Sequence, residues 1–192
     1  MLSPNVIYFA VSLNLIGHIL YVRSIIKGYT KPNLVSWFIW LLAPFLGVFF
    51  QLRAGAGLSV LPIFMAGFGS LLVMFVAILT KNGFWKINTF DIYCGLLSLL
   101  ALIFYVLTHN LGISILFAIL SDGLAAVPTV VKSWKFPETE MWAPYLLPIF
   151  SNIVGLLIIK DWIFSIYSFG IYFLVMDTTI LFCIYRKKIF KK

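Results

Sequence analysis

Charge is scarce in this sequence, and acidic charge is the scarcest. Only 10% of the 192 residues are charged and only six are Asp or Glu, whereas 62% are hydrophobic. Soluble domains are about 45–50% apolar and about 25% charged, so this composition excludes a soluble globular protein and a disordered chain. The mean hydropathy of +1.07 indicates an integral membrane protein.

Cysteine is nearly absent. Cys94 and Cys183 both lie in apolar runs, where thiols usually serve as small hydrophobic side chains. This excludes a disulfide-stapled secreted module, and the residues suggest neither a metal site nor a cofactor site. No basic residue precedes Arg23, and no A-x-A-like site follows the first apolar run. We therefore expect that run to remain as a membrane span rather than to be cleaved as a signal peptide.

Long apolar runs fill most of the chain, over residues 4–26, 34–52, 57–80, 91–108, 111–133, 141–159 and 162–185. Each run can cross a hydrocarbon core of about 30 Å as a helix, and none alternates like a barrel strand. The turn between the fourth and fifth runs is the shortest, because only His109 and Asn110 separate them. The sequence predicts an all-α integral membrane protein with seven transmembrane helices and no room for a soluble domain.

Basic residues lie almost entirely on one side of the predicted membrane. The side of the N-terminus holds two of the 14 Lys and Arg residues, Arg53 and Lys160, and the opposite side holds twelve. Loops rich in Lys and Arg face the cytoplasm, so we expect an external N-terminus and a cytoplasmic C-terminus in a plasma or inner membrane. This topology and the lipid bilayer account for the net charge of +8, and nucleic acid is not an expected partner.

A shift of 105 residues aligns two parts of the sequence. Both parts follow the pattern V-x4-K-x4-P-x4-W, and both lie at a junction between two predicted spans. This predicts two parallel three-helix repeats, residues 1–80 and 111–192, joined by a linker helix within residues 81–110. The second repeat ends in a basic cytoplasmic tail. The matched pairs are Val22 with Val127, Lys27 with Lys132, Pro32 with Pro137 and Trp37 with Trp142.

These features resemble the PQ-loop and SWEET superfamily of membrane transporters. Pro128-Thr129 stands where that family has Pro-Gln, whereas Arg23-Ser24 stands there in the first repeat. The family also has kinking prolines, and Pro44, Pro128 and Pro148 correspond to three of them. The resemblance implies a SWEET-like 3+1+3 plan and transport by alternating access, with these three prolines as hinges.

Five polar residues lie near the middle of the predicted spans: Asn14, His18, Asp122, Asn152 and Asp177. A group about ten residues from the cytoplasmic boundary lies about 15 Å deep, near the bilayer midplane. Parallel repeats place their binding sites at that depth. We predict that these residues bind a small polar solute, with the amides forming hydrogen bonds and the acids binding a cation or a proton. The alternative is a buried network that only fixes helix packing, and it is preferred for Asn14 alone.

Aromatic residues near the cytoplasmic boundary form a predicted gate. Trp40 and Tyr145 lie one turn further into the membrane than Trp37 and Trp142. An aromatic belt at the membrane interface already explains Trp37 and Trp142. In the third span, the small residues within 67–70 predict a close approach between helices.

The sequence therefore predicts a membrane transporter of a small polar solute, with sugars among the candidates, rather than an enzyme. The Gly-x-Gly-Asp motif of presenilin-type aspartyl enzymes is absent, and no serine or zinc constellation is present. A vitamin-precursor carrier of the PnuC type, which shares the 3+1+3 plan, is an alternative, and so is a non-transporting receptor or scaffold. We also expect pH-dependent transport, with Asp177 as the proton carrier and Asp122 paired with His18. Association with further copies of the chain is left open.

Overall fold

The computed structural model describes residues 5–80, 85–108 and 110–190, and over these residues every regular element is a helix. Two short 3-10 helices, η1 (Gly57–Val60) and η2 (Pro137–Thr139), precede α3 and α6. The α-helices are α1 (Val6–Ile26), α2 (Leu34–Arg53), α3 (Leu61–Leu79), α4 (Thr89–Leu107), α5 (Leu111–Lys135), α6 (Ala143–Leu157) and α7 (Phe164–Ile189).

Six helices, α1 to α5 and α7, are long and apolar enough to cross a membrane. Helix α6 is apolar but has only 15 residues, which corresponds to about 22 Å. The predicted run over 141–159 thus forms a shorter helix than expected. Its first turn contains Pro144, whose fixed backbone angle suits a helix start and whose missing N–H would have no partner within the helix there. The other helices agree with the predicted runs to within a few residues.

Asparagine side chains cap the start of three helices. Asn33 caps α2, Asn110 caps α5, and Asn88 forms a reciprocal capping box with Asp91 at the start of α4. Each side chain accepts a hydrogen bond from a backbone N–H group that would otherwise lack a partner at the helix end. The shortest predicted turn, between α4 and α5, is therefore defined by a cap at Asn110, while His109 lies outside the described residues.

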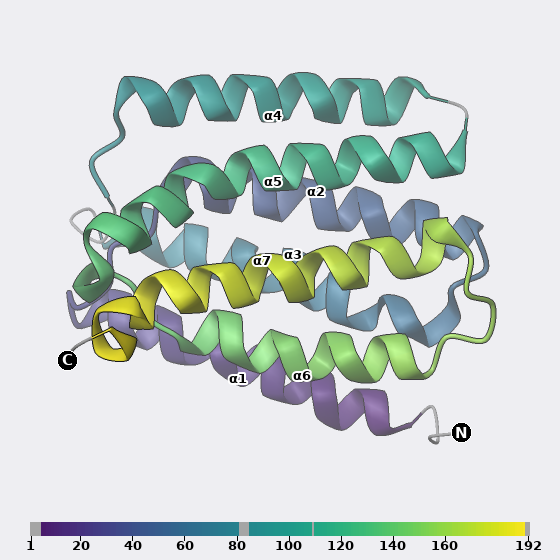
Figure 1. The fold of residues 1–192 in the computed structure, drawn as a ribbon, viewed down its shortest axis with the longest axis horizontal. Coiled ribbons are helices and arrows are strands. Elements are labelled where there is room, and N and C mark those ends of the chain that lie inside the picture. The colour runs from purple at the N-terminus through teal and green to yellow at the C-terminus, as the bar shows by residue number, and fades with distance from the viewer. Residues whose placement is uncertain (1–4, 81–84, 109, 191–192) are drawn as a thin grey trace.

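The helices pack as two triplets with one helix at the edge. In the first triplet, α3 packs against both α1 and α2; in the second, α7 packs against both α5 and α6. The triplets meet where α1 packs against α6 and where α2 packs against α5. Helix α4 lies at one edge of the bundle against α5, and α1 and α6 lie at the opposite edge (Figure 1). The start of α1 and the end of α7 lie at opposite ends of the bundle (Figure 1).

Large apolar side chains cover the outside of the bundle. Phe9, Phe75, Tyr93, Leu107 and Val175 are each more than 60% exposed. A water-soluble monomer rarely exposes apolar surface on this scale, and in a bilayer that surface would face lipid. Together with the six long apolar helices, it indicates a multi-pass membrane protein.

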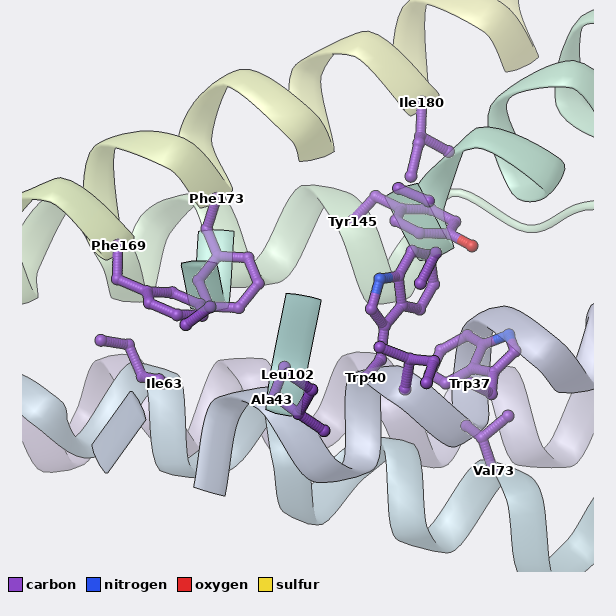
Figure 2. Close-up of a cluster of buried hydrophobic side chains, with 14 of the residues drawn as sticks. Trp37, Trp40, Ala43, Ile63, Val73, Leu102, Tyr145, Phe169, Phe173 and Ile180 are labelled. Atoms are coloured by element: carbon purple, nitrogen blue, oxygen red, sulfur yellow. The ribbon is translucent and has the colours of Figure 1, made fainter. Parts of the chain in front are cut away.

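An aromatic core lies where the two triplets face each other. Figure 2 shows Trp37 and Trp40 rising from α2, with Trp40 directed towards Tyr145 of α6. Phe169 and Phe173 extend from α7 in the same core. Several polar side chains are buried beside these rings, and they define the candidate site.

Candidate functional site

A cavity lies between the two triplets, and six helices contribute to its wall. The cavity volume is about 40 Å³, so the cavity is narrow in this structure. A solute of several heavy atoms can enter only if the side chains or helices separate. The lining residues are His18, Trp37, Trp40, Pro44, Ala66, Ser70, Asp122, Pro144, Tyr145, Pro148, Asn152, Phe173, Met176, Asp177 and Ile180.

Four of the five predicted binding residues line this cavity: His18, Asp122, Asn152 and Asp177. They come from α1, α5, α6 and α7, so residues far apart in the sequence meet here. Asn14 does not line it. Its Nδ2 donates a hydrogen bond of 3.0 Å to Ser151 Oγ, which joins α1 to α6 in the buried interior. The contact agrees with a packing role for Asn14.

The predicted gate and hinge residues divide in the same way. Trp37, Trp40, Pro44, Tyr145 and Pro148 line the cavity. The two other predicted residues do not line it: Pro128 is buried within α5, and Trp142 is 36% exposed at the N-cap of α6.

His18 occupies a place that a glycine leaves open. A Cβ atom built on Gly69 of α3 would overlap the His18 ring, so only glycine at position 69 lets the imidazole lie there. The ring also meets Trp37 edge to face, with centroids 6.2 Å apart, and its Nδ1 is 3.0 Å from the carbonyl oxygen of Asn14. The small residues of the third span thus accommodate a side chain of α1.

Asp122 does not form the predicted pair with His18. Its Oδ2 instead accepts a hydrogen bond of 2.7 Å from the Tyr172 hydroxyl of α7, while its Oδ1 is buried without a hydrogen-bond partner. Tyr172 was not predicted, because the rotation of α7 about its axis decides which side chain reaches Asp122. The backbone carbonyl of Asp122 accepts a hydrogen bond of 3.3 Å from Trp40 Nε1, which connects the two triplets.

Two further polar atoms in the cavity wall, Trp37 Nε1 and Tyr145 Oη, are buried without a hydrogen bond of good geometry, and both lie close to the Tyr21 hydroxyl. Buried polar atoms are nearly always hydrogen-bonded in proteins. The wall therefore offers an acceptor without a partner, Asp122 Oδ1, to whatever occupies the cavity.

An ionic cluster joins the triplets at the end of the bundle where α1 ends and α6 begins. We call it the end cluster, and it consists of Tyr21, Lys132 and Glu140. Glu140 forms an ion pair with Lys132 and accepts a hydrogen bond of 2.5 Å from the Tyr21 hydroxyl. Lys132 Nζ also donates a hydrogen bond of 2.5 Å to the carbonyl oxygen of Lys31. The backbone N–H of Lys31 in turn donates a hydrogen bond of 3.1 Å to the backbone carbonyl oxygen of Thr139.

The end cluster was not predicted from the sequence. Lys132 was counted among the basic residues of the cytoplasmic side without a partner being predicted, and it is only 3% exposed, while Glu140 is 8% exposed. The signal was present as a lysine before the Phe136-Pro137 turn and two glutamates after it. Spacing alone does not determine which glutamate folds back onto the lysine.

Comparison of the chain with known protein families, with curated proteins and with solved structures gives no match. Within the described residues, no group of three or more His, Cys, Asp or Glu side chains could hold a metal ion. The function is therefore inferred from the cavity, the end cluster and the helix packing.

Proposed function

We propose that this protein is a membrane transporter that carries a small polar solute through the cavity between the two triplets. One observation carries this proposal: acid, amide and imidazole side chains from four helices line one buried cavity at the boundary between the triplets. Ionisable side chains within membrane spans are rare, and they usually mark a pathway for a solute or an ion.

Helix packing supports a repeat within this transporter. In each triplet the third helix packs against the other two, and the contact of α1 with α6 is the counterpart of the contact of α5 with α2. We propose that the triplets are parallel repeats joined by α4, and that α6 completes a set of seven spans. The basic residues then favour an external N-terminus and a cytoplasmic C-terminus.

The end cluster is the proposed cytoplasmic gate in its closed form. Alternating access requires one end of the pathway to close while the other opens. Two contacts hold the triplets together at that end: the Tyr21 hydroxyl of α1 donates to Glu140, which precedes α6, and Lys132 of α5 donates to the carbonyl oxygen of Lys31, which follows α1. Pro44 and Pro148 lack a backbone N–H within α2 and α6, which gives these helices points at which to bend.

A buried packing network is the main alternative. The hydrogen bond between Asn14 and Ser151 fits such a network, since it satisfies groups on two helices. Asp122 Oδ1 does not fit it, because this oxygen is buried in the cavity wall without a partner. A buried acceptor without a partner favours a solute site over a receptor or scaffold that only packs.

Uptake into proteoliposomes tests this proposal. Purified protein is reconstituted and offered radiolabelled sugars, amino acids, nucleosides, vitamin precursors and amines, with protein-free liposomes as the background. We expect saturable uptake of at least one solute, reduced about tenfold by Asn152→Leu, which removes a polar group from the cavity wall.

The matched control is Ile153→Leu, because the neighbouring Ile153 side chain is 41% exposed and does not line the cavity. Its uptake should equal that of the wild type. If folded and inserted protein takes up every solute only at the level of protein-free liposomes, transport is contradicted and a non-transporting scaffold is favoured.

A further inference from the structure

The cavity has the opposite charge character to the chain as a whole. The chain carries a net charge of +8, yet two of the described lining residues are acids, Asp122 and Asp177, and none is Lys or Arg. Both acids are buried, with exposed fractions of 1% and 8%. Each carboxylate needs a compensating positive charge if it is to stay ionised away from water.

Aromatic rings line the cavity together with these acids. The rings belong to Trp37, Trp40, Tyr145 and Phe173. The indole rings of Trp37 and Trp40 meet edge to face at 78°, with their centroids 5.3 Å apart. Aromatic faces attract cations, and groups of such faces recognise substituted ammonium ions.

An oxygen without a partner extends this pattern. Asp122 Oδ1 is buried in the cavity wall without a hydrogen-bond partner, so it can accept a hydrogen bond or face a positive charge. A ligand that matches it carries a positively charged ammonium group.

We propose that the solute is a small organic cation, an ammonium compound. This inference rests on the proposed function, since it identifies the solute of the same cavity. An anion would face two acids, whereas an organic cation supplies the positive charge that lets buried acids stay ionised. Metal cations such as calcium are bound by six or more oxygen ligands, whereas much of this wall is aromatic or aliphatic.

Binding to the purified full-length protein in detergent tests the charge requirement directly. The probes are choline, ethanolamine and the neutral analogue of choline in which a quaternary carbon replaces the nitrogen. Affinity is measured from the shift of the thermal unfolding midpoint with ligand concentration. We expect at least one of the two cations to bind about tenfold or more tightly than the neutral analogue.

Substitutions connect that preference to the acids. Asp177→Asn and Asp122→Asn should each reduce the ratio of cation to neutral affinity towards one, and Asp177→Glu should retain it. Asp161→Asn is the control, because Asp161 is an exposed acid outside the cavity, and it should leave the ratio unchanged. The wild-type comparison of choline with its carbon analogue remains decisive even where a variant does not fold.

Three results would overturn the inference. The first is equal affinity for the cation and the neutral analogue, and the second is a cation preference that survives both Asn substitutions. The third is no binding of either cation at millimolar concentration. Its failure is distinguishable from failure of the proposed function. Saturable flux of a neutral solute without cation binding would overturn the cation and leave transport in place. Selective cation binding without flux of any bound probe would support the site and overturn transport.

Discussion

Two buried regions of this protein hold acidic side chains, and their surroundings differ. In the end cluster, Glu140 is matched by Lys132 and by the Tyr21 hydroxyl. In the cavity, Asp122 has only the Tyr172 hydroxyl on one oxygen and no partner on the other. A fully partnered charge fixes the position of two helices, whereas an acid with an open oxygen is available to a ligand. Under the proposed function, the first arrangement suits closure and the second suits recognition.

The largest effect is expected from a substitution in the end cluster. Glu140→Gln removes the charge that compensates buried Lys132, and breaking a buried ion pair in this way destabilises a protein by about 3–5 kcal/mol. The midpoint of thermal unfolding in detergent should fall clearly. Glu138→Gln is the control, since Glu138 is exposed, and it should change stability by less than about 0.5 kcal/mol. Equal midpoints for the two variants would show that the contacts of Glu140 do not stabilise the bundle.

A second prediction displaces His18 from the cavity wall without changing its chemistry. Gly69→Ala puts a methyl group where the His18 ring lies, and overpacking of this kind destabilises by about 1–3 kcal/mol. Solute uptake should fall with it, and His18→Ala in the same chain should restore part of the stability. Gly123→Ala is the control, because its Cβ would meet no atom closer than 3.7 Å. A normal midpoint and normal uptake for Gly69→Ala would contradict the arrangement of His18 over Gly69.

The third prediction concerns the removal of an acidic charge from the cavity. Asp177→Asn should shift the unfolding midpoint far less than Glu140→Gln, by about 1 kcal/mol or less, because no ion pair is broken. It should nevertheless abolish uptake driven by a pH gradient, and Asp122→Asn should alter that dependence. Proteoliposome uptake at several gradients measures this. Full pH-driven accumulation by the double Asn variant would exclude proton coupling and leave a facilitator.

The smallest effect is expected at the hinge. Pro128→Ala supplies the N–H that α5 lacks and allows a straighter helix, so transport should slow severalfold while folding and insertion persist. A rate equal to the wild type would exclude Pro128 as a hinge. Since Pro128 does not line the cavity, Pro148→Ala provides the comparison with a proline that does.

Sequence patterns predicted the helices better than their partners. Apolar runs locate α2 and α5 to within two residues, because desolvation of the backbone in a membrane requires continuous helices. Counting depth along each span also selected His18, Asp122, Asn152 and Asp177, which line one cavity. That these residues bind a solute stays a prediction.

Contacts that depend on how each helix is rotated about its axis could not be predicted from the sequence. The hydrogen bond from Tyr172 to Asp122 and the ion pair of Lys132 with Glu140 both require side chains from different elements to face each other. Spacing along one helix gives the face a residue occupies relative to its neighbours, but not the helix that packs against that face. The shorter length of α6 was also not predicted, because the apolar run over 141–159 continues beyond both ends of the helix, Ala143–Leu157.

A reversible cross-link between the triplets tests alternating access most directly. The backbone N–H of Lys31 and the carbonyl of Thr139 are 3.1 Å apart, which brings their Cα atoms near the separation that a disulfide spans. Cysteines at these two positions, in a chain with Cys94→Ala and Cys183→Ala, would lock the proposed gate when oxidised. Uptake of the best solute in proteoliposomes should stop on oxidation and return on reduction. Undiminished uptake by fully cross-linked protein would contradict transport by separation of the triplets at this end.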